Sequence, residues 1–192
     1  MGEKVRTFVA IEIPREVQDR AAALIGQLNG TEAKVKWVRP HQLHWTLKFL
    51  GDVELREIPE VCEAVDKAVA PFAPFDVEVR GAGAFPDIRR PRTVWLGVGP
   101  GTDEMVALHA AIEKSLKPLG YRPEGRKFRP HITIGRVRNS PTGIPELGNL
   151  IQEQADFSAG VSAVFEVTVF SSDLGREGPT YDPLGHAELR GK

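Results

Sequence analysis

The sequence predicts an α+β protein whose single domain is built from two related lobes. A β-rich run that ends at a proline occurs twice, as RTFVAIEIP (residues 6–14) and RTVWLGVGP (residues 92–100). Each run is followed by apolar residues at helical spacing and then by a strand containing His-x-Thr. Thr7 lies 37 positions before His44, and Thr93 lies 38 positions before His131. A repeat of this length is too long for a solenoid and predicts two lobes of one domain.

The first repeat contains two predicted helices. Apolar residues recur at helical spacing over residues 17–28, and Asn29-Gly30 provides a stop signal. A second helix is predicted over residues 58–69 from the same kind of spacing, and a strand over residues 75–79 follows it.

The second repeat has the same order of elements. A helix is predicted over residues 105–116 with Thr102 as its cap, and a weaker one over residues 145–154, where Gly148 interrupts the pattern. Strands at 163–170 and 181–189 complete the chain. The repeats span about residues 5–80 and 92–170, with closing strands to 190. No low-complexity linker separates them, so residues 1–192 are predicted to form one bilobal domain.

Composition limits the classes of partner and site. The 192 residues carry a net charge of -1, so any nucleic acid must be bound by a local basic patch. The single cysteine, Cys62, excludes an internal disulfide and a cysteine-rich metal site. No apolar stretch approaches the length of a membrane span, and the N-terminus does not resemble a signal peptide. We therefore expect a soluble, cytoplasmic protein with no membrane partner.

The first of the two His-x-Thr strands is LHWTLKFLG (residues 43–51). Alternate side chains of a strand share a face. Strict alternation therefore places His44, Thr46 and Lys48 together on one face. The opposite, apolar face is predicted to pack on the core and consists of Trp45, Leu47 and Phe49.

The second strand is PHITIGRVR (residues 130–138), in which His131 and Thr133 face away from the core. A pseudo-twofold relation between the lobes would place two imidazoles and two hydroxyls around one cavity. Arg136 lies at an odd offset from His131, so it reaches this face only if the strand contains a bulge.

This combination of side chains predicts hydrolysis of a phosphodiester. Imidazoles have an unperturbed pKa of about 6.5, so one can accept a proton while the other donates one. Threonine hydroxyls donate hydrogen bonds to phosphate oxygens, and Lys48, Arg136 or Arg138 can balance the phosphate charge. His-x-Thr is not a metal-ligand spacing, and no carboxylate or cysteine cluster accompanies it. We expect a site without metal or other cofactor.

At these residues the chain resembles the 2H phosphoesterase superfamily, and within it the RNA 2′,3′-cyclic phosphodiesterases, historically called 2′-5′ RNA ligases. The resemblance covers nearly the whole chain. Besides the opening strand and the two motifs, it includes FPDIRRPRTVWLGV (residues 85–98) and SSDLGREGPTYDPLGHAEL (residues 171–189). It implies a bilobal α+β fold with antiparallel sheets flanking a central cleft and helices outside.

The resemblance also implies an activity and residue roles. Such enzymes open a terminal 2′,3′-cyclic phosphate of RNA to a 2′-phosphate, and ligate some tRNA half-molecules through a 2′-5′ bond. It implies that His44 is the proton donor, that His131 is the proton acceptor, and that Thr46 and Thr133 bind the phosphate. The spacing alone does not assign the direction of proton transfer, because the site is nearly symmetric.

The surroundings of the motifs suggest how RNA is held. The loop FPDIRRPR (residues 85–92) places Arg89, Arg90 and Arg92 beside Phe85, and a solvated loop is the alternative explanation for these charges. Phe85 or Tyr181 is suited to stack on a base. The predicted partners are RNA with a cyclic phosphate end and tRNA fragments. We expect a monomer, because the duplication already supplies a two-lobed site.

Two other functions remain open from the sequence. The cleft could serve an RNA-binding module without turnover, or an esterase of the same superfamily could act on a small cyclic nucleotide. Two intact motifs favour an enzyme, because binding alone requires phosphate donors but no acid/base pair.

Overall fold

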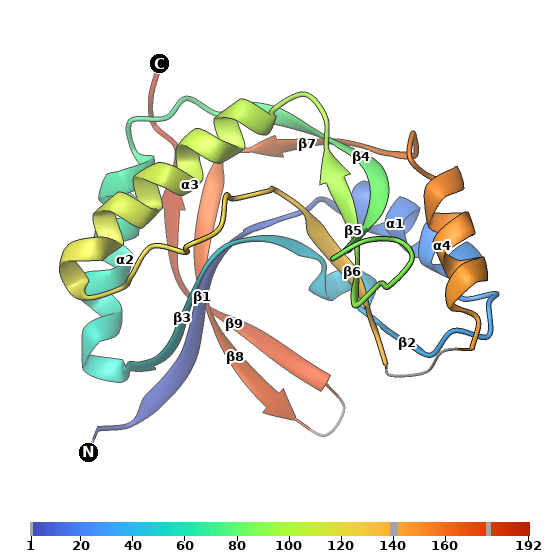
Figure 1. Ribbon diagram of the computed structural model, residues 1–192. Helices are drawn as coiled ribbons and strands as arrows, with labels where there is room; N and C mark the ends of the chain where they lie inside the picture. The colour runs from blue at the N-terminus through green and yellow to red at the C-terminus, as the bar shows by residue number, and fades with distance from the viewer. Residues whose placement is uncertain (1, 139–141, 176–177) are drawn as a thin grey trace.

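The computed structural model describes residues 2–138, 142–175 and 178–192, so Arg176 and Glu177 of the last quoted stretch lie outside it. The chain has an α+β fold, as predicted (Figure 1). The helices are α1 (Arg15–Leu28), α2 (Ile58–Val69), α3 (Thr102–Leu116) and α4 (Ile144–Glu153). The strands are β1 (Lys4–Glu12), β2 (Val35–Trp37), β3 (His44–Glu54), β4 (Phe75–Phe85), β5 (Thr93–Val98), β6 (Ile132–Val137), β7 (Ser158–Val164), β8 (Glu166–Gly175) and β9 (Gly178–Glu188).

The strands form one curled antiparallel sheet with β3 and β6 at its centre. Its order is β7-β4-β5-β6-β3-β1-β8-β9, and β2 also pairs with β6. The centre divides the sheet into two matching halves, β3-β1-β8-β9 and β6-β5-β4-β7. β4, at the end of the first sequence repeat, joins the half built on β6, and β8, at the end of the second repeat, joins the half built on β3.

The helices cover the outer face of the sheet in two pairs (Figure 1). α2 and α3 pack together against the half that contains β3, β8 and β9, whereas α1 and α4 cover β7 and β4 of the other half. α1 follows β1 and α3 follows β5 in the chain, so each crosses to the half of the sheet that its preceding strand does not belong to. All four predicted helices are confirmed.

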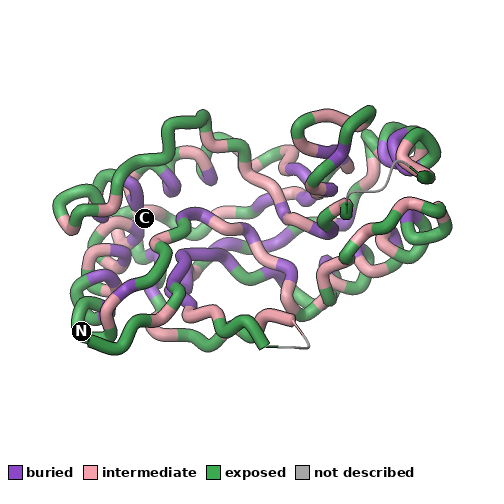
Figure 2. Tube along the Cα trace, turned by 60° about the horizontal axis from the view of Figure 1, so that its bottom comes forward, coloured by how far each residue is buried: buried purple, intermediate pink, exposed green. Residues whose placement is uncertain are grey.

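The core lies between these helices and the sheet. On α1 the buried residues fall at helical spacing and face the strands, namely Val17, Ala21, Leu24 and Leu28. Figure 2 shows buried stretches along the strands and exposed stretches on the outer turns of the helices. A second, small apolar cluster lies apart from the main core and consists of Phe8, Ala10 and Phe170, with Tyr181 packed against it.

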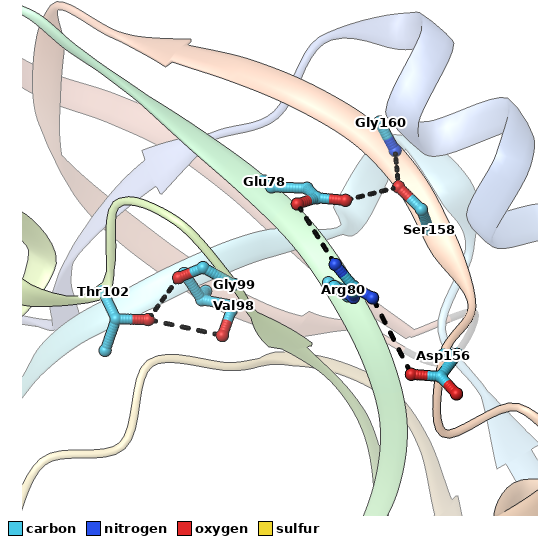
Figure 3. Close-up of polar contacts among 8 residues, drawn as sticks. All are labelled: Glu78, Arg80, Val98, Gly99, Thr102, Asp156, Ser158 and Gly160. Atoms are coloured by element: carbon cyan, nitrogen blue, oxygen red, sulfur yellow. Dashed lines mark hydrogen bonds and ion pairs between the residues drawn. The ribbon is translucent and has the colours of Figure 1, made fainter.

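Two local sequence predictions are wrong. The strand expected over residues 163–170 is interrupted at Phe165, which is 60% exposed, because β7 pairs with β4 while β8 pairs with β1 near the other end of the sheet. The cap of α3 is Gly101, with φ of 94°, rather than Thr102. The Thr102 hydroxyl lies 2.6 Å from the carbonyl oxygen of Gly99 and 3.3 Å from that of Val98 (Figure 3).

Polar side chains join β4 to β7 at the edge of the sheet (Figure 3). The Glu78 carboxylate accepts a hydrogen bond of 3.1 Å from the Ser158 hydroxyl. The Arg80 guanidinium lies 3.9 Å from Glu78 and 3.8 Å from Asp156. These contacts lie at the surface, so they contribute little to stability.

Candidate active site

The two His-x-Thr motifs meet at the centre of the sheet. Trp45 of β3 stands opposite Ile132 of β6, and both side chains are 0% exposed on the core side. Extending this antiparallel register by one residue places His44 opposite Thr133, and Thr46 opposite His131. The structure therefore brings these two histidines and two threonines together on the face of the sheet that the helices leave uncovered.

Each imidazole is oriented by a backbone carbonyl two residues earlier. His44 Nδ1 lies 2.8 Å from the carbonyl oxygen of Gln42, and His131 Nδ1 lies 2.7 Å from that of Arg129. A carbonyl oxygen only accepts hydrogen bonds, so Nδ1 carries a proton in both rings and Nε2 is the nitrogen that titrates. His44 Nε2 lies 3.0 Å from the Thr46 hydroxyl oxygen.

Both imidazoles lie against the edge or face of aromatic rings. Tyr181 meets His44 at 5.3 Å and 87°, and Phe85 meets His131 at 5.1 Å and 86°. Phe8 lies 5.1 Å from His44 on another side. Burial in these surroundings lowers the pKa of both histidines, and the carbonyl hydrogen bonds oppose this effect.

The expectation that Lys48 binds the phosphate is wrong. The register between β1 and β3 shifts at this point, so Leu47 and Lys48 both turn towards the core. Lys48 is 2% exposed, and its Nζ lies 2.6 Å from Glu113 Oε1 and 2.9 Å from the carbonyl oxygen of Arg122. The same shift turns Phe49, which alternation placed in the core, outwards to 56% exposure.

Arg136 reaches the site because β6 has an equivalent irregularity. The register between β5 and β6 shifts so that Ile134 and Gly135 are both buried. Thr133 and Arg136 stand opposite Trp95 and Thr93, which share a face, so the Arg136 side chain projects on the same side as Thr133. Burial lowers the pKa of His131, and the positive charge of Arg136 lowers it further. Burial raises the pKa of Tyr181, and the charge of Arg136 partly offsets that rise.

The other predicted residues lie around this centre in different surroundings. Phe85 contacts His131, and the Arg129 guanidinium lies over the Phe85 ring, 5.6 Å from its centre. Arg89 lies 3.8 Å from Asp87. Arg90 and Arg92 are exposed on the same loop. Tyr181 borders His44 from β9.

Sequence reasoning missed several residues of the site. Phe8 and Phe170 stack at 5.4 Å beside His44. The alternation in RTFVAIEIP places Phe8 on the face of β1 that does not carry the buried Val9 and Ile11. Gln42 donates a hydrogen bond to the carbonyl oxygen of Pro179 and so links the entry of β3 to the β8–β9 hairpin. That contact joins positions far apart in the chain, so no local sequence pattern predicts it. Trp95 is half-buried on the site face.

Neither a metal cluster nor a membrane helix is found in the described part of the chain. In residues 2–138, 142–175 and 178–192, no three His, Cys, Asp or Glu side chains are grouped so that they could hold a metal ion. Over the same residues, no helix has the length and apolar character needed to cross a membrane. The polar groups that β3 and β6 bring to the site include two imidazoles, two threonine hydroxyls and one guanidinium.

This arrangement defines a phosphoesterase of the two-histidine class, and sequence comparison agrees. The chain matches the 2′-5′ RNA ligase superfamily over residues 14–173. It belongs to that superfamily, and the resemblance predicted from the motifs is confirmed.

Two relatives and one solved structure illustrate matches over almost the full length of both chains. The RNA 2′,3′-cyclic phosphodiesterase of Methanothermobacter thermautotrophicus is 35% identical over 94% of this chain and 97% of its own. That of Thermotoga maritima is 35% identical over 97% of both. The crystal structure of E. coli LigT complexed with 3′-AMP, 25% identical, has a TM-score of 0.77 and covers 97% of this chain and 99% of its own.

Proposed function

We propose that this protein opens the terminal 2′,3′-cyclic phosphate of RNA to a 2′-phosphomonoester, with His44 as proton donor and His131 as proton acceptor and without a metal. The activity class is supported by full-length relatives that are named RNA 2′,3′-cyclic phosphodiesterases. The structure adds two imidazoles whose Nε2 atoms share one face of the sheet.

The reaction needs one proton removed and one delivered. Nε2 of neutral His131 takes a proton from water as the water oxygen attacks phosphorus. The bond between phosphorus and the 3′-oxygen breaks, and Nε2–H of the His44 imidazolium protonates the departing oxygen. The products are a 2′-phosphate and a free 3′-hydroxyl, and both histidines return to their starting state at the next exchange with water.

The guanidinium groups near His131 support this direction. Burial, and after it the charges of Arg136 and Arg129, lower the pKa of His131 and so favour the neutral imidazole that a base requires. Burial also lowers the pKa of His44. His44 stands instead beside Thr46 and the aromatic rings of Phe8 and Tyr181. An anionic phosphate bound between the motifs would stabilise the His44 imidazolium, as an acid requires.

Hydroxyl and guanidinium groups are positioned to hold the phosphate. Thr46 and Thr133 project beside the two imidazoles, and Arg136 follows on the same face. Such donors stabilise the charge that develops on non-bridging oxygens during attack. The solved complexes of E. coli LigT, one with phosphate and one with 3′-AMP, support phosphate binding by a protein of this fold.

The terminal nucleotide would be held between the aromatic side chains that flank the histidines. Phe85 and Tyr181 are the proposed stacking residues, because each already meets an imidazole edge-on. Arg89, Arg90 and Arg92 remain proposed RNA contacts on the adjoining loop.

The test uses an oligoribonucleotide ending in a 2′,3′-cyclic phosphate, with separation of the 2′- and 3′-phosphate products. The parent should give the 2′-phosphate, and His44→Ala and His131→Ala should each reduce the rate by about 10²- to 10⁴-fold. His186→Ala is the matched control, since His186 pairs with Glu166 on the far part of β8–β9 and should retain the parent rate. Binding without turnover by the parent would instead indicate an RNA-binding module.

The same site is proposed to act also as a 2′-5′ ligase. A 5′-hydroxyl would replace water as the nucleophile that one imidazole deprotonates. Its oxygen would bond to phosphorus, the bond between phosphorus and the 3′-oxygen would break, and the other imidazole would protonate the 3′-oxygen. Incubation of tRNA halves, one with a cyclic phosphate and one with a 5′-hydroxyl, should yield a product whose junction resists nucleases specific for 3′-5′ bonds. If no joined product forms when both RNA ends are present at millimolar concentration, ligation is contradicted and the hydrolysis proposal is unaffected.

A further inference from the structure

Four cations line the edge where β2 pairs with β6. Lys36 stands opposite Arg136, and the hydrogen bond from Arg138 N to Lys34 O continues this register by one residue pair. Directly opposite residues in an antiparallel pair project to the same face. Lys34, Lys36 and Arg138 therefore extend outward from Arg136 on the face that carries the catalytic centre; we refer to these three residues as the basic edge (Figure 1 shows β2 beside β6).

The inward face of the same strands explains why these cations point outward. Val35 and Val137 stand opposite each other and pack against the core, and Gly135 lies under the ring of Trp37. A Cβ at Gly135 would come within 2.6 Å of that ring, so the two strands are held in close contact. The Trp37 indole also donates a 2.8 Å hydrogen bond to Asn29, which fixes β2 in place.

The arrangement is unfavourable for the free protein. Like charges directly opposite each other on a sheet destabilise it. All four side chains are exposed, and none has an acidic partner within ion-pair distance among residues 2–138, 142–175 and 178–192. Arg89, on the loop between β4 and β5, is by contrast beside Asp87. A chain with a net charge of -1 thus concentrates positive charge next to its proposed active site.

We propose that the basic edge binds backbone phosphates of the RNA strand that precedes the cyclic end, an inference that rests on the proposed function. Arg136 lies between this edge and the catalytic centre, so a strand whose terminal phosphate occupies the centre has a continuous line of cations beside it. Alternate residues on a strand are about 7 Å apart. That separation is of the order of the distance between successive phosphates in a single strand, and it suits a polyanion better than a folded protein partner.

The experiment compares two substrates with the same reacting group. One is adenosine 2′,3′-cyclic phosphate, and the other is a short oligoribonucleotide ending in the same cyclic nucleotide. The variant Lys34→Gln/Lys36→Gln removes two charges from the basic edge. The matched control, Lys114→Gln/Lys117→Gln, removes two exposed charges at the end of α3, on the helical side.

The basic edge variant should raise KM for the oligoribonucleotide by roughly tenfold at about 0.1 M salt, and lower the slope of log KM against log salt by about 1 to 1.5. The kcat/KM of the basic edge variant for the mononucleotide should match that of the parent. The control variant should match the parent in KM for the oligoribonucleotide and in kcat/KM for the mononucleotide. The variant should be no less stable than the parent to heat, since it removes like-charge repulsion.

The outcomes separate the two proposals. Equal loss on both substrates would overturn the inference, since the lysines would then act on the reacting phosphate or on the fold. Unchanged KM and salt slope for the oligoribonucleotide would also overturn it, while leaving the catalytic proposal intact. A parent that hydrolyses neither substrate would overturn the proposed function and the inference together.

Discussion

Trp45 and Ile132 stand opposite each other at the centre of the sheet, and this buried pair joins β3 to β6. His44 and Thr46 flank Trp45 in the chain, and His131 and Thr133 flank Ile132; these proposed catalytic and phosphate-binding residues project to the other face. The placement of His44 relative to His131 therefore depends on the pairing of the strands that carry these two core residues. We expect catalytic geometry and core packing to be coupled at this cross-strand pair.

We predict that Ile132→Ala reduces kcat by about tenfold or more at a temperature where the protein is fully folded, since small misplacements of catalytic groups are costly. Loss of its side chain should also lower the free energy of unfolding by about 2–5 kcal/mol. Ile151→Ala is the matched control, since Ile151 is equally buried but lies on α4. It should lose similar stability and keep the parent kcat; equal losses of kcat in both variants would contradict the coupling.

The pH profile of kcat/KM should be bell-shaped, with its acid limb set by His131 and its alkaline limb by His44. Burial lowers the pKa of both groups in the free enzyme, so the maximum of kcat/KM should lie below the usual histidine pKa of about 6.5. The alkaline limb of the kcat profile should lie at higher pH than that of the kcat/KM profile, since a bound phosphate stabilises the His44 imidazolium. Coinciding alkaline limbs for kcat and kcat/KM would contradict this account.

Arg136→Gln should move the acid limb of kcat/KM to higher pH. Removing this positive charge lets the pKa of His131 rise, so the imidazole becomes protonated and inactive as a base at a higher pH than in the parent. The rate at the optimum should also fall by about 10²-fold through loss of a phosphate contact. Arg136→Lys keeps the charge and should keep the acid limb in place; an unshifted limb in the Gln variant would show that Arg136 acts only on phosphate.

The sequence was sufficient for the helices, the repeated order of elements and the two motifs, because each depends on local spacing. Strict alternation then failed at two positions for one reason. Leu47 and Lys48 both turn inward, and so do Ile134 and Gly135, at shifts in register that only the neighbouring strands reveal. Strict alternation therefore placed Lys48 wrongly at the phosphate, and it brought Arg136 to the site only on the condition that β6 contains a bulge.

The two shifts are equivalent in the two motifs. Phe49 follows His44 by five residues and Arg136 follows His131 by five, and both are exposed on the site side of their strands. The pairing of Gln42 with Pro179 and of Lys48 with Glu113 also joins distant positions, which composition and periodicity do not encode. Contacts of this kind determine which faces the motifs present, and they require the fold.

A chelator should leave the hydrolysis rate unchanged, because the proposed proton transfers use only His44 and His131. The comparison is between protein dialysed against EDTA and the same protein supplemented with Mg²⁺, Mn²⁺ or Zn²⁺, assayed on the cyclic oligoribonucleotide. Equal rates are expected. A rate abolished by EDTA and restored by one of these ions would contradict the metal-free mechanism.

Glu113→Gln should lower the free energy of unfolding by about 3–5 kcal/mol, because it leaves the Lys48 ammonium buried without a counter-charge. Glu63→Gln provides the control, since the Glu63–Lys67 pair has the same types of charge on the neighbouring α2 but is 64% and 70% exposed. That change should cost less than about 0.5 kcal/mol. Chemical denaturation of both variants at neutral pH measures the difference. Similar small losses would mean that water reaches Lys48, whereas recovery of stability in Lys48→Met/Glu113→Leu would confirm that the unpaired charge, rather than lost volume, causes the defect.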